Sequence, residues 1–227
     1  MTETADKNKR IAVFDICDTL YYSNTTHDFV DFCLAARKAS IKRLAGMLLT
    51  GRFSPLRFFG ITVSVLTGKD LPKAAKVFLL KGLSESELRE TARDFVREYL
   101  EPRKIKQAQS IISDSVSDGV TAVLCSSSIE PVVRAVAESL NIENFVCTTL
   151  EIQNGTFTGR LAADVTGRKL DHLRKAVPNS CIVLAVSDNK TDLELLLAAN
   201  RGVAMVYGER SREFWKGHGI ETIDADQ

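Results

Sequence analysis

The residues best suited to chemistry in this sequence are acidic side chains that directly follow short apolar segments. Asp15 ends the apolar run Ile11–Phe14, and Asp188 follows the apolar run 181–186. A carboxylate at the end of a buried strand is costly to place, because it loses hydration unless it is paired or meets a ligand. Open α/β sheets bind their ligands at the carboxyl ends of their strands. We therefore expect Asp15 and Asp188 to belong to one ligand site.

A serine follows a third apolar run in the same way. Ser126 comes directly after residues 120–125 and before a segment with helical spacing. Serines at such junctions are also common helix caps, and Ser127 or Ser128 suits that task better. One of these two neighbours of Ser126 is therefore the expected cap.

A lysine and a second acid complete the set of candidates. Lys169 lies in the first turn of an expected helix, where lysines are usually solvated, and Arg168 beside it is the alternative cation. The spacing to the apolar residues that follow favours Lys169, which only the combination of motifs described below singles out. Asp192 lies four residues after Asp188, so the two acids share one face of a helix start. The helix dipole alone accounts for one of these acids but not for both.

The elements that must position these residues alternate between strand and helix from Gly119 onward. The expected strands are 120–125, 145–147, 150–152, 156–158, 181–186 and 203–207, and the expected helices are 129–140, 169–177 and 192–199. Asn154-Gly155 predicts a tight hairpin turn. Repeated strand–helix units imply a parallel sheet covered on both faces, which the first strand at 11–15 joins. The expected fold is α/β, with a Rossmann-like parallel sheet core.

Between the first and second strands the pattern is helical. Ser84 and Glu87 form a capping box that starts one helix, and Pro102 marks its end. Apolar residues recur at helical spacing in Phe29–Ala36, Leu44–Leu49, Phe58–Leu66, Ala74–Leu80 and Glu87–Tyr99. We expect residues 23–102 to form a helical cap, inserted into a core made of residues 1–22 and 103–227.

One stretch of this cap, Arg37–Leu66, mixes lysines and arginines with large apolar residues. A basic amphipathic surface that contacts lipid is one interpretation. An ordinary helical subdomain with solvated basic residues is the interpretation that we favour. The chain contains no run of the ~18 apolar residues that a bilayer-spanning helix needs.

Composition narrows the class of protein. The 227 residues are 44% hydrophobic and 26% charged, and the net charge of +1 gives no global field that favours nucleic acid. Five cysteines without CxxC spacing and three histidines argue against a structural zinc site. The first ten residues lack the apolar core of a secretion signal. A reducing cytoplasm is the expected location.

Taken in order, Asp15, Ser126, Lys169 and Asp188 resemble the four motifs of the haloacid dehalogenase superfamily. The resemblance covers about Lys9–Ile223 and is strongest to the phosphoserine-phosphatase-like branch, whose helical cap follows the first motif. The stretches Cys125–Pro131 and Gly159–Leu161 are similar to that branch as well.

The resemblance implies a role for each matching residue. Asp15 would attack phosphorus and form an aspartyl-phosphate, while Thr19, Ser126 and Lys169 would bind the substrate: Thr19 braces the loop, Ser126 donates to a phosphoryl oxygen and Lys169 offsets negative charge. Asp188 would coordinate Mg²⁺ with Asp15, and Asp192 would ligate the ion or hold its shell. Mg²⁺ suits such a small set of hard oxygens.

Cys17 is the main departure from the family pattern, since the phosphatases usually carry a second aspartate there. That aspartate protonates the leaving oxygen and later activates water. A thiol is a weak hydrogen-bond partner and, when neutral, a poor base. General acid–base catalysis typically contributes about 10²–10⁴-fold, so turnover is expected to be slow. The metal contact attributed to this position uses the backbone carbonyl, which Cys17 retains.

Three hypotheses of function follow from these residues. The leading one is a cytoplasmic, Mg²⁺-dependent phosphatase-like hydrolase that acts on a small phosphorylated molecule. The alternative is a phospholigand-binding or regulatory protein with little turnover. Dehalogenases, phosphonatases and ion pumps of the superfamily also lack the second aspartate, but a dehalogenase needs no magnesium shell, and the pair Asp188 and Asp192 argues against it. The sequence does not specify the substrate or an oligomeric state.

Overall fold

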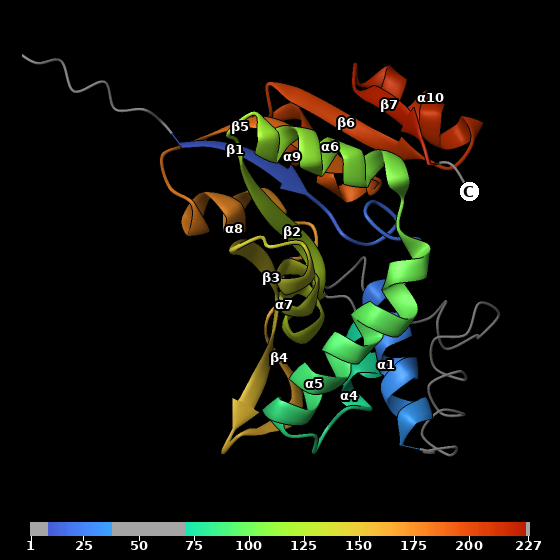
Figure 1. Ribbon diagram of the computed structural model, residues 1–227, viewed down its shortest axis with the longest axis vertical. Coiled ribbons are helices and arrows are strands. Elements are labelled where there is room, and N and C mark those ends of the chain that lie inside the picture. Colours follow the sequence, from blue (N-terminus) through green and yellow to red (C-terminus); the bar gives the residue numbers. More distant parts are fainter. Residues whose placement is uncertain (1–8, 38–70, 226–227) are drawn as a thin grey trace, which may run out of the picture.

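The computed structural model describes residues 9–37 and 71–225. Within this part of the chain, the strands form a seven-stranded sheet in the order β4-β3-β2-β1-β5-β6-β7 (Figure 1). The central strand β1 (Lys9–Phe14) pairs in parallel with β2 (Thr121–Ile129) and with β5 (Ser180–Ser187). Only the pairing of β3 with β4 is antiparallel. The expected α/β fold class with a mostly parallel, Rossmann-like sheet is confirmed.

Helices cover both faces of this sheet. The remaining strands and the helices of the core are β3 (Asn144–Gln153), β4 (Thr156–Ala163), β6 (Arg201–Val206), β7 (Glu221–Asp224), α6 (Lys106–Ser117), α7 (Glu130–Ser139), α8 (Lys169–Ala176), α9 (Leu193–Leu197) and α10 (Glu209–Gly217). Successive side chains of a strand point to opposite faces. Accordingly, Ala12 and Phe14 of β1 pack in the apolar cluster that includes α6 and α7. Ile11 and Val13 pack in the cluster that includes α8, α9 and α10.

The strand β3 differs from the sequence-based expectation. Residues 145–147 and 150–152 were expected as two segments, but they belong to one strand. Its first half pairs in parallel with β2 and its second half pairs antiparallel with β4, so its apolar pattern changes where its partner changes. The expected hairpin turn is confirmed: Asn154 and Gly155 both have positive φ, 50° and 72°.

A group of helices lies apart from the upper part of the sheet (Figure 1). The group comprises α1 (Thr25–Ala36), α4 (Leu71–Phe78) and α5 (Glu85–Phe95), followed by the π-helical turn η1 (Val96–Leu100) and the 3₁₀ turn η2 (Glu101–Arg103). Ser84 and Glu87 form the expected capping box at the start of α5. Pro102 lies in η2, where the helical segment ends. The exact limits of a cap at 23–102 stay a prediction.

The chain leaves and re-enters the core at adjacent points. The backbone N–H of Tyr22 donates to the Arg103 carbonyl at 2.8 Å, and that of Ile105 donates to the Leu20 carbonyl at 3.0 Å. The outgoing and returning segments therefore run side by side, just after β1. The helices expected at 44–49 and 58–66, and the basic stretch beyond Arg37, lie outside the described residues. In the residues that are described, no helix has the length and apolar character to cross a membrane.

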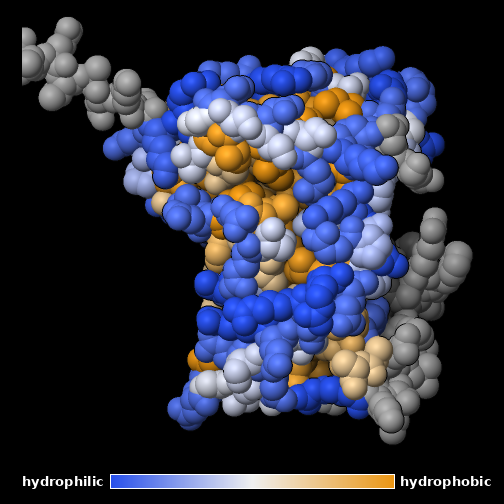
Figure 2. Space-filling model, in the orientation of Figure 1, coloured by the Kyte–Doolittle hydropathy of each residue, from blue (hydrophilic) through white to orange (hydrophobic). Residues whose placement is uncertain are grey.

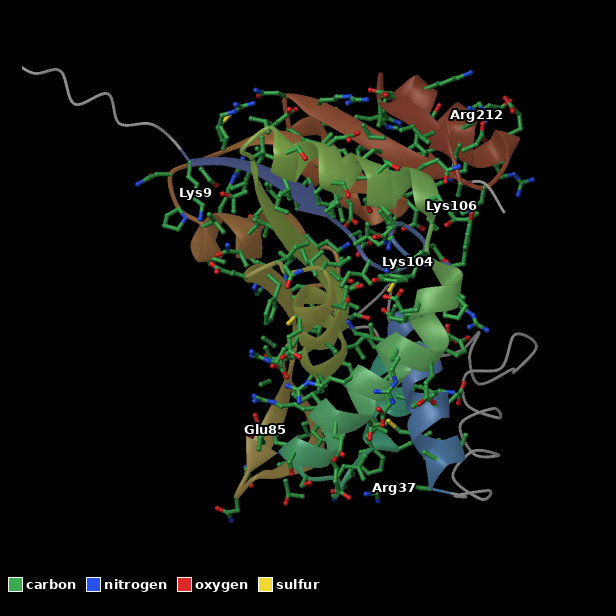
Figure 3. The ribbon with its side chains drawn as sticks, viewed as in Figure 1. Lys9, Arg37, Glu85, Lys104, Lys106 and Arg212 are labelled. Atoms are coloured by element: carbon green, nitrogen blue, oxygen red, sulfur yellow. The ribbon has the colours of Figure 1, made fainter. Side chains whose placement is uncertain are left out.

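Most of the described charged side chains lie on the outside of the molecule. Lys9, Arg37 and Lys106 point away from the ribbon in Figure 3 and are exposed. The face drawn in Figure 2 is largely hydrophilic, and orange hydrophobic patches are visible mainly in its upper and central parts. The buried polar residues at the ends of β1, β2 and β5 are therefore exceptions that need a separate explanation.

Candidate active site

Asp15 follows β1 and is almost completely buried, with 3% of its surface exposed. Its backbone N–H donates to the Val186 carbonyl of β5 at 2.9 Å, which extends the sheet pairing by one residue. The carboxylate oxygen Oδ1 accepts a hydrogen bond from the backbone N–H of Ile16 at 2.7 Å. The central strand thus fixes this carboxylate at the carboxyl edge of the sheet.

Lys169 supplies the cation that faces Asp15. It opens α8, is 3% exposed, and places Nζ 2.7 Å from Asp15 Oδ2 and 2.6 Å from Asp192 Oδ2. Burial acts to lower the pKa of Lys169, but the carboxylates of Asp15 and Asp192 outweigh it and hold the pKa above its ordinary value. Lys169 therefore stays charged and bridges the two acids.

Asp192 holds Lys169 in place. Its Oδ2 also accepts a hydrogen bond from Ser187 Oγ at 2.6 Å, while Oδ1 is buried without a hydrogen-bond partner in the described part of the chain. The carboxylate does not cap α9, although it stands at the N-cap position. Burial raises the pKa of Asp192, and the ion pair with Lys169 opposes that effect. Among the described residues, Asp192 therefore acts as an ion-pair partner of Lys169.

Thr19 and Asp188 form a reciprocal pair. Thr19 Oγ1 donates to Asp188 Oδ1 at 3.1 Å and accepts from the Asp188 backbone N–H at 3.0 Å. Burial and the nearby carboxylates of Asp15 and Asp18 raise the pKa of Asp188 well above its ordinary value. This edge of the sheet therefore concentrates negative charge.

Asp18 shapes the loop between Asp15 and Thr19. Its φ of 45° lies in the left-handed region, which aspartate tolerates better than most residues. Tyr207, which follows β6, donates its hydroxyl to the Asp18 carbonyl at 2.6 Å. A side chain that follows β6 thus braces the loop at its residue with positive φ.

Ser126 is fully buried in β2, and its hydroxyl accepts a hydrogen bond from the backbone N–H of Ser128 at 3.3 Å. The expectation that Ser127 or Ser128 caps the following helix is wrong. The N-cap of α7 is Ile129, which makes no side-chain capping bond, because the strand continues to that residue. Ser128 instead turns its hydroxyl toward Cys17.

Cys17 lies in a cluster of hydroxyl groups. Its sulfur is 2.9 Å from Thr25 Oγ1 and 3.8 Å from Ser128 Oγ. The hydroxyl groups of Thr25 and Ser128 also form a hydrogen bond with each other, and Thr26 Oγ1 lies 3.0 Å from Ser128 Oγ. Burial, and next the charge of Asp15, raise the pKa of the Cys17 thiol to about 11. The thiol is therefore protonated at neutral pH.

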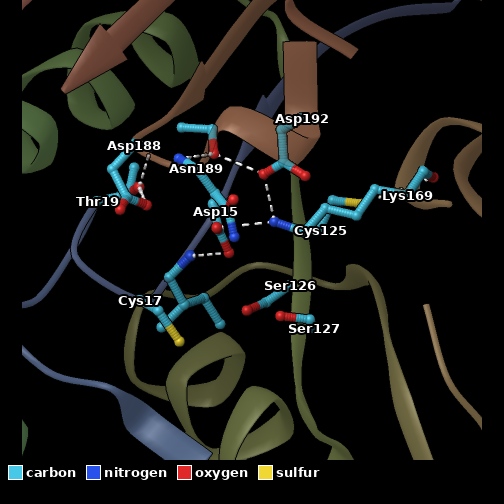
Figure 4. A network of polar contacts seen from close by, with 12 residues as sticks. Asp15, Cys17, Thr19, Cys125, Ser126, Ser127, Lys169, Asp188, Asn189 and Asp192 are labelled. Carbon is cyan, nitrogen blue, oxygen red and sulfur yellow. Dashed lines mark hydrogen bonds and ion pairs between the residues drawn. The ribbon is translucent and has the colours of Figure 1, made fainter. Parts of the chain in front are cut away.

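The structure brings Asp15, Lys169 and Asp192 into direct contact and joins Thr19 to Asp188 beside them (Figure 4). Figure 4 also shows Cys17 and Ser126 on the same side of this network. Sequence reasoning missed Ser187 as a partner of Asp192, and it missed Thr25 and Ser128 as neighbours of Cys17. The serine at 187, in place of the glycine common in the resembled motif, was the one signal that could have pointed to the first of these contacts.

Comparison with known proteins identifies the family. The family model described as haloacid dehalogenase-like hydrolase matches residues 12–197. This chain belongs to that family. A comparison with curated proteins found no match. The match spans every residue assigned to the site above, from Asp15 to Asp192.

Solved structures share the fold of this family member. A protein of unknown function from Bordetella pertussis Tohama I is 21% identical, with a TM-score of 0.71 and coverage of 97% of this chain and 100% of its own. A HAD family hydrolase from Salmonella enterica serovar Typhi is 16% identical, with a TM-score of 0.62 and coverage of 96% and 68%. A phosphoserine phosphatase, as a phospho-aspartyl intermediate analogue, is 17% identical, with a TM-score of 0.56 and coverage of 97% and 95%.

The donor groups of the site fit the Mg²⁺ that the family implies. In residues 9–37 and 71–225, no three His, Cys, Asp or Glu side chains are grouped as in a closed metal site. Asp15 and Asp188 nevertheless supply hard oxygens where negative charge accumulates, and Asp192 Oδ1 is a buried acceptor to which no group in the described segments donates. Mg²⁺ is usually held by one or two carboxylates together with waters and substrate phosphate, so this small donor set suits it.

Proposed function

We propose that this protein is a Mg²⁺-dependent phosphatase that hydrolyses a small phosphomonoester through Asp15. The observation that carries the proposal is the buried contact of Asp15 with the Lys169 cation at a ligand-binding sheet edge. A structural neighbour described as a phospho-aspartyl intermediate analogue supports the same chemistry. The free cysteines fit our further proposal of a reducing, cytoplasmic location.

In the proposed reaction, a carboxylate oxygen of Asp15 forms a bond to phosphorus while the ester P–O bond breaks. The departing alcohol oxygen takes a proton from a water molecule, and the resulting hydroxide, or a second water, then hydrolyses the aspartyl-phosphate to inorganic phosphate and free Asp15. Lys169 offsets the negative charge of the transferred group, and Ser126 donates to one of its oxygens. Thr19 holds Asp188 in position through their two hydrogen bonds.

Asp15, Asp188 and the backbone carbonyl of Cys17 would hold Mg²⁺, with Asp192 acting through Lys169 or through the shell of the ion. When bound, the ion would supply positive charge that stabilises the transferring phosphoryl oxygens. The electrostatics of Asp188 support this assignment, because its carboxylate lies beside those of Asp15 and Asp18.

The second candidate function is a phospholigand-binding protein with little turnover. Cys17 favours it, since a thiol with a pKa near 11 gives up its proton reluctantly and acts as no base when protonated. Binding would use the same Asp15, Lys169 and Ser126. The two candidates therefore differ in rate and share one site.

A screen of phosphorylated metabolites with and without Mg²⁺ tests the proposal. We expect Mg²⁺-dependent phosphate release from at least one small phosphomonoester, and its loss in Asp15→Asn. The matched control is Asp171→Asn, which changes an exposed carboxylate at the start of α8. Turnover that survives Asp15→Asn contradicts the covalent mechanism. Binding of a phosphorylated metabolite without phosphate release favours the phospholigand-binding function.

A further inference from the structure

A buried lysine outside the family motifs connects the helical group to the phosphate side of the site. Lys73 lies in the first turn of α4 and is 4% exposed. Its Nζ is 2.6 Å from Asp164 Oδ1 and 2.6 Å from Thr166 Oγ1. It also lies 3.3 Å from the Ser127 carbonyl and 3.4 Å from Thr148 Oγ1. One ammonium group thus contacts three separate segments of the core.

Two of those segments adjoin residues assigned to the site. Ser127 directly follows Ser126, and the segment 164–166 precedes Lys169 by a few residues. The backbone N–H of Arg168 donates to the Val165 carbonyl at 3.0 Å, so a short turn links this segment to the start of α8. A displacement of Lys73 would therefore change the contacts of the segments next to Ser126 and Lys169.

The core side of this contact is organised around one carboxylate oxygen. Asp164 Oδ1 accepts from Lys73, from Thr148 Oγ1 at 3.2 Å, and from both Thr166 Oγ1 at 2.7 Å and the Thr166 backbone N–H at 3.0 Å. Burial acts to raise the pKa of Asp164, but Lys73 and Thr166 outweigh it and lower the pKa. The carboxylate is ionised, and Lys73 provides the charge that opposes it.

We propose that Lys73 is a positioning residue that couples the seating of α4 to the arrangement of Ser126 and Lys169. Asp15 and Ser126 are 3% and 0% exposed, so both lie inside the packed structure that these segments help to form. Any movement of α4 away from the core would have to break the Lys73–Asp164 pair. When the pair forms again, the segments that position Ser126 and Lys169 would return to the arrangement described above.

The same helix supplies a matched control. Lys76 is equally buried, at 2% exposed, and its Nζ lies 2.6 Å from Asp31 Oδ1. That partner belongs to α1, so the pair connects two helices of the helical group without touching Ser127 or Asp164. Loss of Lys76 removes an ion pair of the same kind from α4, but it leaves the connection to the core in place.

Hydrogen exchange measured by mass spectrometry separates coupling from general loosening. In Lys73→Met, peptides containing the amides of Ser128 and Thr166 should exchange about tenfold faster or more, because an unpaired Asp164 no longer holds its segment. In Lys76→Met, faster exchange should be confined to α1 and α4. Lys73→Arg should recover part of the protection, because a guanidinium can also donate to Asp164.

Two results overturn the proposal: exchange in Lys73→Met that rises only in α1 and α4, or equal effects of the two lysine variants at Ser128 and Thr166. If Lys73→Met does not fold, Asp164→Asn is measured instead and must raise exchange in the same two peptides.

The kinetic experiment rests on the proposed function. There, kcat should fall about 10- to 100-fold in Lys73→Met, with recovery in Lys73→Arg and little change in Lys76→Met. Absence of hydrolysis in the wild type counts against the proposed function alone, because the exchange result still decides the coupling.

Discussion

Lys169 lies 2.7 Å from Asp15, and both side chains are almost fully buried. The contact joins the end of the central strand to the start of α8, across residues 154 positions apart in the sequence. Because Lys169 also pairs with Asp192, its removal would leave two buried carboxylates without their cation. The relationship is therefore structural as well as catalytic in the proposed mechanism.

Lys169→Met should lower the free energy of unfolding by about 3–5 kcal/mol at neutral pH, which is typical when one partner of a buried ion pair is removed. The loss should shrink as pH falls, because protonation of Asp192, whose pKa is raised by burial, removes an unpaired charge. Urea unfolding at several pH values measures both effects.

The control for this prediction is Arg201→Met. Arg201 pairs with Glu221 at 2.7 Å, but the two side chains are 55% and 45% exposed. Exposed pairs contribute at most about 1 kcal/mol, so this variant should unfold almost like the wild type. Equal losses in the two variants would show that the burial of Lys169 does not matter to stability.

Asp188→Ala should abolish Mg²⁺ binding measured by calorimetry, because Asp188 is one of two carboxylates assigned to the ion. Asp171→Ala is the matched control, since it removes an exposed carboxylate from α8. It should leave the titration unchanged. Binding of wild-type strength in Asp188→Ala would contradict the metal assignment.

The residues at strand ends could be predicted because their signal is local. The apolar runs before Asp15, Ser126 and Asp188 identify buried parallel strands, and the edge where such strands end follows from topology. The hairpin at Asn154 and Gly155 was predicted for a similar reason, because few residue pairs adopt two successive positive φ angles.

Contacts between distant segments could not be predicted in this way. Cys17 meets Thr25 and Ser128 only because β1, α1 and β2 pack together, and 111 positions separate Cys17 from Ser128. Lys73 carried no sequence signal, since a lysine on a short helix is usually solvated. Strand β7 was missed as well: its four residues, Glu221–Asp224, do not alternate in burial, and they form a strand by pairing with β6.

Stability should fall as pH rises above about 9, because buried thiols resist ionisation. Burial raises the pKa of Cys33, Cys125 and Cys147 from 9.0 to about 12. Since each folded pKa exceeds the unfolded value, the stabilisation is complete below the unfolded pKa and is lost progressively as pH rises toward the folded pKa. Urea midpoints at about pH 8 and about pH 10 should differ for this reason.

Cys125→Ala is the informative variant for that effect. Cys125 is fully buried, so the substitution costs packing at every pH, but it removes one thiol that would ionise on unfolding. The decrease between the two pH values should therefore be smaller than in the wild type. An identical decrease would mean that Cys125 does not contribute to the pH dependence.

Cys17→Asp should raise phosphate release by a factor within about 10²–10⁴, which is the usual contribution of a general acid–base group. An aspartate has nearly the volume of cysteine, and Thr25 and Ser128 could donate hydrogen bonds to its carboxylate. The backbone carbonyl assigned to the metal is unchanged. The measurement is kcat for the best substrate of the screen at neutral pH.

Cys17→Ser is the control, because it keeps a small polar group that cannot supply a proton more readily than the thiol. It should give no gain. If Cys17 itself takes part in turnover as a thiol, both variants should lower kcat, and alkylation should inactivate the wild type. That alkylation should accelerate as pH rises toward about 11, where burial places the thiol pKa. If Cys17→Asp releases no phosphate from any of many phosphoesters while the ligand still binds, the phospholigand-binding function explains the site better than hydrolysis does.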